Sequence, residues 1–592
     1  MAASQPKMRD HTSSARALAI ASSVLAAASA GMVFQIYGAA DGVGVIDVLR
    51  SVLIFLSTWW LAWGAATALL GLTSRQRPAP ARITGPIIGR SVVIVPVYNE
   101  DPRITFARIA AMDESITAAK AACGSAAQVD FAVLSDTRDE KIALLEQRWF
   151  ARLLARQHAE GRMFYRRREK NTGRKAGNIE DFITTSGAAW DYAVILDADS
   201  LMEGDTILEM IRRIEAAPQL GLLQTLPRVV GATTRFGRAM QFAAGFHSPI
   251  FARGLAVTQG RTGPFWGHNA IVRIRAWAES CGLPELPGKA PFGGHIMSHD
   301  YVEAAMLARA GWLVRLDDDL EGSFEEGPEN IIDHAKRDRR WCQGNLQHAK
   351  LVAAPGLKPW SRFVFIQGIF AYVAPLLWLA FIAASIAAVY WAETPDYFPE
   401  ANWPFPVFPN DQTPKAIGLA VGVFGLLVMP KLFVAIDAIF TGRVRGFGGA
   451  GGAFRAVFAE LALSSVIAPI LMAFQSRSVI QVLLGRDGGW PPNNRGDGGL
   501  DIAEAWAAGR WISFWGLGGM IATHLLAPVL TLWLLPVALP MLLAPLLIWW
   551  TSRTARPRAF PVPEDVTTPA VILRHAAVLS DWSESGMEAK LG

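Results

Sequence analysis

Long apolar runs stand near both ends of this chain, and a more polar segment lies between them. The first two runs extend from about residue 17 to 37 and from about residue 45 to 70. Because roughly 20 consecutive apolar residues suffice for a helix to cross a bilayer, we predict two transmembrane helices within residues 17–71, after a cytoplasmic segment at residues 1–16. A signal peptide is the alternative for the first run, but its length and the second run directly behind it favour two spans.

Apolar runs return after residue 350 and predict a second transmembrane region at residues 351–551. Its runs lie at residues 363–391, 417–440 and 514–550, the last long enough for two spans. The run at residues 457–474 is ambiguous, because arginines behind it indicate the cytoplasm; a re-entrant or interfacial hairpin broken at Pro469 would reconcile both signals. We predict at least six spans, four to five of them in this region. Residues 552–592 form a polar, Pro-rich tail that we expect to be only partly ordered.

Between the two apolar regions, at residues 88–350, short β-branched runs alternate with polar helical stretches. The runs lie at residues 91–96, 131–135, 192–196 and 221–225. This rhythm predicts an α/β domain, Rossmann-like and with a mostly parallel sheet, embedded between helical transmembrane segments. In such sheets the ligand binds beyond the carboxyl ends of the strands. The polar residues that follow strands at such ends are Tyr98, Glu100, Asp136, Asp197 and Asp199.

The charges of the connecting segments place this domain in the cytoplasm. The connector between the first two runs lacks Lys and Arg, whereas Arg75, Arg77, Arg82 and Arg90 follow the second run. Lys and Arg accumulate in the cytoplasmic loops of membrane proteins. The loop at residues 392–414 lacks both and carries carboxylates, so we expect it on the outer side. The net charge of +5 then reflects basic cytoplasmic loops and not nucleic-acid binding.

Composition supports a membrane protein in a reducing compartment. The mean hydropathy is +0.26, and only 18% of the residues are charged, a balance that needs lipid-facing surface. Cys123, Cys281 and Cys342 show no paired spacing, which argues against a disulfide framework and a zinc site. Lys431 and Asp437 lie about a turn and a half apart inside one predicted span. A functional site in the membrane and charges that reach its cytoplasmic interface are the two interpretations.

The motif Asp197-Ala-Asp199 directly follows an apolar strand. Two carboxylates two residues apart project to the same side of a strand end and can hold a hard divalent cation beside phosphate oxygens. Asp136, at the preceding strand end, would bind a nucleoside or assist at the metal; capping a turn is the alternative. A basic cluster at residues 166–175 leads into the start of a predicted helix at Lys175. Positive charge and helix N–H groups suit a nucleotide diphosphate, and a solvated basic face is the alternative.

Two later motifs carry a base and a cation–indole group. One carboxylate, Asp300, suffices as the base of a single displacement at an anomeric carbon, whereas double displacement needs a second. In RDRRW at residues 337–341, Arg340 can stabilise a departing diphosphate and Trp341 can stack on a sugar ring; a membrane-interface anchor is the alternative. The G-x-G-x-x-G match at residues 446–451 has no strand before it, so we reject a dinucleotide site.

Together these motifs resemble family 2 glycosyltransferases of the GT-A fold, the membrane-embedded group that includes cellulose and hyaluronan synthases. The resemblance covers about residues 90–350 and extends into the flanking spans. Six blocks look still more like the glucan biosynthesis glucosyltransferase H family: SDTRD, YRRREKNTGRKAGN, LDADS, GPFWGHNAIVR, SHDYVEAAMLARAGW and RDRRWCQGN. That family makes the β-1,2-linked backbone of osmoregulated periplasmic glucans from UDP-glucose. The resemblance implies a multi-pass protein of the bacterial inner membrane with its catalytic domain in the cytoplasm.

The resemblance also implies roles for individual residues. Asp136 would contact the uridine and Lys175 the diphosphate, while Asp197 and Asp199 would hold Mg²⁺ or Mn²⁺ beside it. Asp300 would be the general base, and Arg340 would lie at the leaving group. The residues that would complete the UDP-sugar site are Tyr98, Glu100 and Asn178, and those at the acceptor site are His268, Asn269 and Trp341. Arg337 stands where cellulose synthases have Gln, which leaves its role open.

The implied reaction is one inverting, metal-dependent step, after which the growing β-glucan leaves through the spans toward the periplasm. The implied partners are UDP-glucose, the glucan, acyl carrier protein, a periplasmic glucan-modifying protein and membrane lipids. One rival is a glycosyltransferase that makes another β-linked polysaccharide or acts on a lipid carrier. The other is a transporter with a regulatory nucleotide-binding domain, which predicts an internal repeat of broken helices; we see no such repeat in the sequence.

Overall fold

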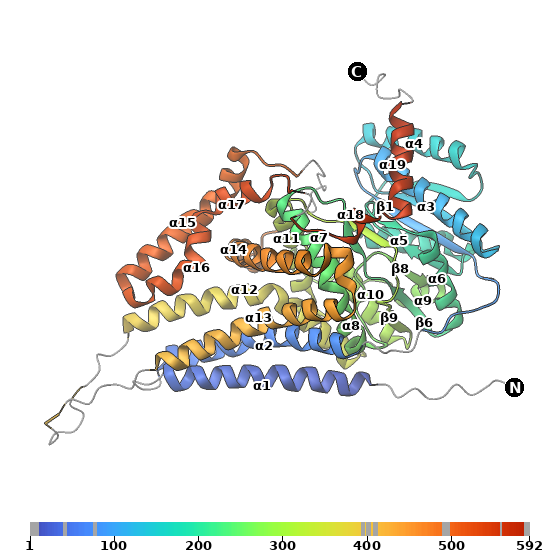
Figure 1. Cartoon of the computed structure of the whole chain (residues 1–592). Helices are drawn as coiled ribbons and strands as arrows, with labels where there is room; N and C mark the ends of the chain where they lie inside the picture. The colour runs from blue at the N-terminus through green and yellow to red at the C-terminus, as the bar shows by residue number, and fades with distance from the viewer. Residues whose placement is uncertain are drawn as a thin grey trace.

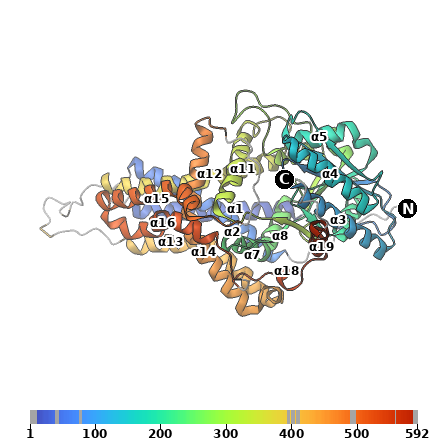
Figure 2. The ribbon, with the colours of Figure 1, turned by 90° about the horizontal axis from the view of Figure 1, so that it is seen from above.

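The computed structural model describes residues 11–38, 44–74, 80–391, 397, 404–405, 412–487, 498–556 and 559–584. Most of the connector between the first two runs, Arg75, Arg77 and most of the loop at residues 392–414 lie outside these ranges, and the charge argument for orientation rests in part on them. Figure 1 shows an α/β domain on one side and long helices that extend from it to the other side. The turned view in Figure 2 gives the same division.

A seven-stranded sheet forms the centre of the α/β domain, with the strand order β3-β2-β1-β4-β8-β6-β9. Strand β8 pairs antiparallel with both neighbours, and every other pairing in the sheet is parallel. The strands are β1 (Ser91–Val97), β2 (Val129–Ser135), β3 (Met163–Arg167), β4 (Tyr192–Ile195), β6 (Leu220–Gln224), β8 (Ala270–Arg273) and β9 (Leu313–Leu316). The central strands are apolar on both faces, and the predicted, mostly parallel sheet is confirmed.

Helices cover both faces of this sheet, which explains the continuous apolar strands. One core lies under α3 (Pro102–Cys123), α4 (Glu140–Gln157) and α6 (Gly204–Ala216). The core on the opposite face lies under α5 (Arg174–Ser186), α9 (Ile274–Ser280) and α10 (His299–Arg309). The side chains of Asp101 and Asp139 accept hydrogen bonds from the first turns of α3 and α4. These caps start the helices close behind β1 and β2 and keep the carboxyl ends of the strands at one edge.

A second, three-stranded sheet links the α/β domain to the helices near the membrane. Its order is β5-β10-β7, with β5 at Leu201–Met202, β7 at Arg228–Val230 and β10 at Ser323–Glu326. Helices α7 (Arg235–Phe246) and α8 (Ser248–Gln259) follow β7, and α11 (Ile331–Gln347) follows β10. Strand β5 begins one residue after Ser200, so this small sheet extends directly from the Asp197-Ala-Asp199 segment.

Among the residues that the structure describes, five helices are long and apolar enough to cross a membrane, and a bent pair adds a sixth candidate. The five are α1 (Thr12–Gly38), α2 (Val45–Thr73), α12 (Pro359–Trp391), α13 (Thr413–Phe440) and α14 (Gly449–Leu483). The bent pair joins Pro528–Leu542, which contains α16 (Thr531–Leu542), to α17 (Ala544–Thr551) at an angle of 59°. Helix α15 (Ile502–Leu526) packs against α16 and α17. The arrangement fits a multi-pass membrane protein.

Helix α14 is continuous, so the ambiguous run at residues 457–474 has no break at Pro469. Pro469 lies inside the helix, which runs for 35 residues. A proline removes one backbone hydrogen bond from a helix, and neighbouring helices can hold the helix together despite that loss. Here α14 packs against α11, α12, α13 and α16.

The intramembrane lysine has a partner on the next helix. The Lys431 amine donates to both carboxylate oxygens of Glu460 at 2.8 and 2.7 Å, and Glu460 is buried. Lys431 therefore joins α13 to α14. Because the ammonium is paired between two helices, this contact is structural support for the region beside α7 and α8.

Residues 559–584 of the tail form two helices that pack on other parts of the chain. Helix α18 (Pro563–Val566) carries Asp565, which binds the Arg238 guanidinium of α7. Helix α19 (Ala570–Glu584) then packs against α3, where Figure 1 draws it beside α3 and α4. Val571, Val578 and Trp582 of α19 are buried in the core of the α/β domain. Their helical spacing was the signal for this helix, which the polar composition around it obscured.

Candidate active site

The predicted polar residues converge at the carboxyl edge of the seven-stranded sheet. Parallel pairing brings the ends of β1 and β2 together, with Val97 opposite Ser135. Tyr98 and Glu100 follow β1, Asp136 follows β2, and Asp197 and Asp199 follow β4. Lys175 lies in the first turn of α5 and its amine forms an ion pair with Asp197. Segments far apart in the sequence thus meet at one edge, where a ligand of such a sheet binds.

The turn at Asp197 is held from behind by buried polar residues. The Asp197 N–H donates to Ser200 Oγ at 3.0 Å, and the Ser200 hydroxyl donates to Asn269 Oδ1 at 2.6 Å. The Asn269 amide in turn donates to Ser323 Oγ at 2.8 Å. Asn269 is completely buried, so it supports the turn and does not line the surface where an acceptor sugar was expected. Its left-handed φ of 49° matches the tolerance of Asn for that region.

Gly267 brings the Asp300 carboxylate close to Lys175. The Lys175 amine donates to the Gly267 carbonyl at 2.8 Å. A Cβ atom on Gly267 would lie 3.4 Å from Asp300 Oδ2, which measures how closely the carboxylate approaches this backbone. The φ of Gly267 is +90°, a conformation that other residues rarely adopt. Asp300, Lys175 and Asp197 therefore surround one short stretch of backbone.

Asp300 has the position and electrostatics of a general base. It lies in the first turn of α10, partly buried. Burial raises its pKa above the ordinary value, and Glu303 adds to the rise, while His299, Lys175 and the Tyr301 N–H oppose it. A carboxylate whose pKa is moved toward neutrality accepts a proton more readily at physiological pH. His299 Nδ1 lies 3.0 Å from Oε2 of Glu303, whose carboxylate is buried.

His268 lies beside the acidic turn. Its Nε2 lies 3.4 Å from Glu325 Oε2, and its Nδ1 lies 3.1 Å from Asn269 Oδ1. Burial lowers the pKa of His268, but Asp197 and Glu325 together outweigh it and the net direction is upward. Burial in turn raises the pKa of Glu325. His268 thus lies next to Asp197, at the surface where the sequence placed an acceptor residue.

Helix α11 presents the cation–indole motif. Trp341 is 42% exposed, and the Arg337 guanidinium lies 4.3 Å from the centre of its ring. Arg337, which replaces a glutamine of the cellulose synthases, therefore stacks on the indole and fixes one of its faces. Asp338 lies between Arg337 and Trp341 in the sequence, and burial raises its pKa to about 6. Helix α11 contacts α12 and α14, so this motif lies where the α/β domain meets the long helices. Arg340 lies on the same helix.

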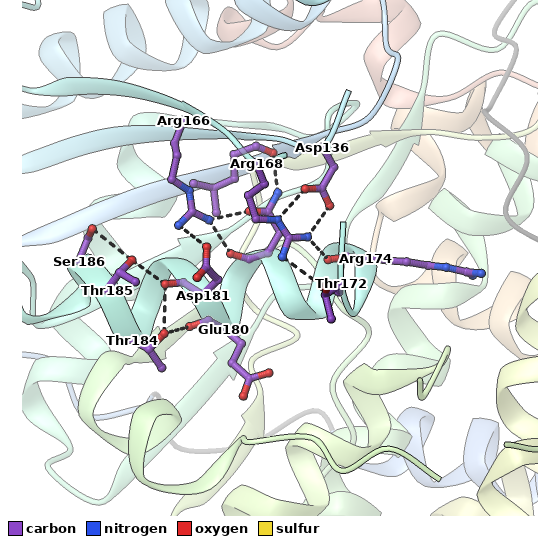
Figure 3. A network of polar contacts seen from close by, with 12 residues as sticks. Asp136, Arg166, Arg168, Thr172, Arg174, Glu180, Asp181, Thr184, Thr185 and Ser186 are labelled. Carbon is purple, nitrogen blue, oxygen red and sulfur yellow. Dashed lines mark hydrogen bonds and ion pairs between the residues drawn. The ribbon is translucent and has the colours of Figure 1, made fainter. Parts of the chain in front are cut away.

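The arginines of the basic cluster are largely committed to carboxylates of the protein. Arg166, Arg167 and Arg168 form ion pairs with Asp181, Glu140 and Asp136 respectively. Figure 3 shows two of these pairs, those of Arg166 and Arg168. The interpretation of the whole cluster as a diphosphate site is therefore too broad. Lys175 is the member of the cluster whose amine lies at the acidic turn.

Asn178 belongs to the same internal network. Its amide donates to the Leu134 carbonyl at 3.1 Å and its Oδ1 accepts from Arg166 at 2.7 Å. Asn178 is 1% exposed, so it holds α5 against β2 and offers no surface to a donor in this state. The expected donor contact of Asn178 is replaced by a supporting role. Beside Asp136, a cavity of about 370 Å³ opens, lined by Thr137, Arg138, Glu140, Arg167, Arg168 and Glu169.

Sequence reasoning missed three residues that shape the site. Asn99 has a φ of 53°, and its Oδ1 accepts from the N–H groups of Arg138 and Asp139 at 3.2 and 3.3 Å. It thereby ties the loop after β1 to the loop after β2. Gly267 and Glu325 were missed as well. Their roles depend on contacts between distant segments, and only the Asn beside Tyr98 carried a local signal, its tolerance of positive φ.

The acidic turn suits a hard divalent cation that is shared with a diphosphate. Asp197 and Asp199 are both partly exposed, and the Lys175 ammonium on Asp197 shows that this turn accepts positive charge. Over the described part of the chain, no group of three or more His, Cys, Asp or Glu side chains could hold a metal by itself. Two carboxylates leave coordination positions that phosphate and water oxygens fill at Mg²⁺ sites. The donor set therefore fits a cation brought with the nucleotide.

Comparisons with known proteins indicate the class of protein. A family model described as glycosyl transferase family 2 matches residues 92–279, and one described as glycosyl transferase family group 2 matches residues 192–405. The sequence and fold are those of a family 2 glycosyltransferase. A solved mannosyltransferase from Pyrobaculum calidifontis, in complex with GDP-Man and Mn²⁺, has a TM-score of 0.43 and 18% identity, over 66% of this chain and 96% of that chain.

Close relatives narrow the family. A glucans biosynthesis glucosyltransferase H from Cereibacter sphaeroides is 63% identical over 580 residues, which cover 98% of this chain and 97% of the relative. Another from Rhodopseudomonas palustris is 39% identical over 573 residues, which cover 93% of this chain and 77% of the relative. The chain belongs to the glucans biosynthesis glucosyltransferase H family.

Proposed function

We propose that this glycosyltransferase is processive and inverting, and that it uses UDP-glucose to build the β-1,2-linked backbone of osmoregulated periplasmic glucans. The observation that carries the proposal is the meeting of Asp300, Lys175 and Asp197 around the Gly267 backbone. A base, a cation and a metal-type carboxylate within one edge of the sheet supply the groups that transfer from a nucleotide-sugar requires.

The donor lies along the carboxyl ends of β1, β2 and β4 in this proposal. Tyr98, Glu100 and the cavity beside Asp136 receive the uridine. Asp197 and Asp199 would hold Mg²⁺ or Mn²⁺, which supplies positive charge beside the diphosphate when it is bound. Lys175, whose amine pairs with Asp197 in the structure, would bind the phosphate oxygens of the donor. The domain is cytoplasmic, where nucleotide-sugars are available, in a bacterial inner-membrane protein.

One displacement follows from the single base. Asp300 takes the proton of the acceptor hydroxyl while that oxygen attacks the anomeric carbon, opposite the leaving UDP. Lys175 and Arg340 stabilise the negative charge that develops on UDP, and this electrostatic contribution is the larger part of catalysis. An α-linked donor then gives a β-linked product. Trp341, whose exposed indole is backed by Arg337, stacks on the acceptor sugar.

The acceptor end of the site points to the long helices. Helix α11 carries Arg340 and Trp341 and contacts α12 and α14. A chain that is extended at Trp341 therefore lies at the entrance to the membrane region, which supports export of the glucan toward the periplasm. Acyl carrier protein and a periplasmic glucan-modifying protein are further partners in this proposal, from the family resemblance alone. The alternative function is a membrane glycosyltransferase that makes another β-linked polysaccharide or glycosylates a lipid carrier.

The experiment is UDP release by purified, detergent-solubilised protein supplied with UDP-glucose and Mg²⁺, followed by linkage analysis of the product. We expect metal-dependent release and a β-1,2-linked polymer. A β-linked polymer of another linkage, or a glucosylated lipid, would replace the proposal by the alternative. Absence of turnover with UDP-glucose, with acyl carrier protein added, would overturn the donor assignment.

A further inference from the structure

We propose that Arg168 is a positioning residue of the donor site, which sets Asp136 and the first turn of α5, and with it Lys175, in one rigid unit. The inference rests on the proposed function, because it assumes that donor nucleotide binds at this edge. It adds a role for one arginine of the basic cluster. Arg168 acts by positioning other residues and not by contact with phosphate.

The Arg168 guanidinium joins three separate acceptors. Its Nε and Nη2 donate to the two carboxylate oxygens of Asp136, each at 2.8 Å. Its Nη1 donates to the Thr172 carbonyl and its Nη2 to the Arg174 carbonyl, both at 3.1 Å. Figure 3 shows these contacts fanning from one side chain. One planar group therefore connects the end of β2 to both sides of the turn that precedes Lys175.

That turn needs outside support because its backbone is strained. Gly173 has a φ of 69°, and Arg174 has a φ of 53°, which is uncommon for a residue with a Cβ. A Cβ on Gly177 would lie 2.1 Å from the Thr172 carbonyl oxygen, so the turn packs directly onto the next turn of α5. Strained backbone persists where surrounding contacts determine it, and the two Arg168 hydrogen bonds to carbonyls are such contacts.

Arg168 is more deeply buried than Arg167, its neighbour on β3. The side chains of Arg168 and Asp136 are 10% and 8% exposed. Those of Arg167 and Glu140 are 26% and 76% exposed, as in an ordinary surface pair. A buried bidentate pair has little rotational freedom and holds its partners to one geometry. Lysine, whose donors all lie on one nitrogen, lacks the planar fork that binds both oxygens of a carboxylate while it reaches two carbonyls.

The opposite end of β3 offers a matched control. Arg162, just before the strand, donates to both oxygens of Asp113 and to the Gln157 carbonyl. It is also a bidentate arginine with a carbonyl contact and a buried aspartate, but it lies at the amino edge of the sheet. Loss of either arginine removes comparable structural contacts, and only Arg168 lies beside the donor site.

The test is calorimetric titration of the full-length, detergent-solubilised protein with UDP and Mg²⁺, alongside kinetics with UDP-glucose. The variants are Arg168→Gln, Arg168→Lys and Arg162→Gln. For both Arg168 variants we expect the Kd of UDP and the KM of the donor to rise at least about tenfold, because small misplacements at a site have large effects. For Arg162→Gln we expect unchanged UDP affinity and donor KM. Thermal unfolding of each variant records any loss of folded protein.

Three results would overturn the proposal. UDP affinity that is unchanged in Arg168→Gln would make Arg168 a purely structural residue, and so would an equal weakening in Arg162→Gln. Full recovery of UDP affinity in Arg168→Lys would show that the positive charge of Arg168 suffices and that its bidentate geometry is not required. A wild-type protein that binds a different nucleoside diphosphate would instead overturn the UDP assignment, and the same three variants titrated with that nucleotide then decide the role of Arg168.

Discussion

The two edges of the seven-stranded sheet use the same residue types differently. At the amino edge, charges form closed pairs: Arg162 pairs with Asp113, and Asp130 accepts from both Arg90 and Trp190. At the carboxyl edge, Asp197 remains 40% exposed although it pairs with Lys175. Closed pairs at the amino edge hold the fold together, whereas the carboxyl edge combines one closed pair, Arg168 with Asp136, and accessible carboxylates that can act on a ligand.

Backbone strain follows the same division. Within the residues that the structure describes, four residues other than glycine have positive φ: Asn99, His158, Arg174 and Asn269. Asn99, Arg174 and Asn269 lie at the carboxyl edge, and His158 lies between α4 and β3 at the amino edge. Strain of this kind persists where function requires a particular geometry. The carboxyl edge is thus the edge that has both an exposed carboxylate, Asp197, and most of these residues with positive φ.

The largest effect should come from removing the base at the active edge. Asp300→Asn keeps the size of the side chain but cannot accept the acceptor proton. We expect glucosyl transfer to fall by about 10²–10⁴-fold, the usual contribution of a positioned base. UDP release measures the loss, and UDP affinity of the variant is the control. A variant that retains a tenth or more of the wild-type rate would remove Asp300 from the mechanism.

Removal of the Arg162–Asp113 ion pair at the amino edge should lower the free energy of unfolding and leave kcat unchanged. Arg162→Gln leaves the Asp113 carboxylate, which is 4% exposed, without its bidentate partner. We expect a destabilisation of about 1–3 kcal/mol, the cost of an unsatisfied buried acceptor. Chemical or thermal unfolding measures it. At a temperature where the variant is folded, its kcat should equal that of the wild type; a lower kcat would show that the two edges are not separate.

The smallest effect concerns pH and sharpens the assignment of the base. Asp300 must be ionised to accept a proton, and burial raises its pKa, so activity should fall as pH drops through a value above the ordinary carboxyl range. His299 lowers the pKa of Asp300. His299→Gln removes that influence and should move the acid limb of kcat/KM to higher pH. An acid limb that stays in place, or moves to lower pH, would contradict this electrostatic role.

The sequence predicts the fold well, and it also indicates which edge of the sheet carries the candidate site. Strands buried on both faces appear as apolar runs, and polar residues directly behind β1, β2 and β4 indicate the ligand side. Contacts between distant segments are invisible in the sequence. It could not show that Arg168 is bound to Asp136, that Asn178 and Asn269 are buried supports, or that Arg337 stacks on Trp341. The helix α19 was missed because the tail was judged by its overall polar, Pro-rich composition, although α19 itself has many apolar positions, among them Trp582.

The most direct test of the account is the configuration of the bond that the protein makes. NMR of the product formed from UDP-glucose labelled with ¹³C at the anomeric carbon reports that configuration before any further reaction. A single base at Asp300 predicts a β-linked product from the α-linked donor. An α-linked product would contradict the account, because retention by double displacement requires a second carboxylate as nucleophile.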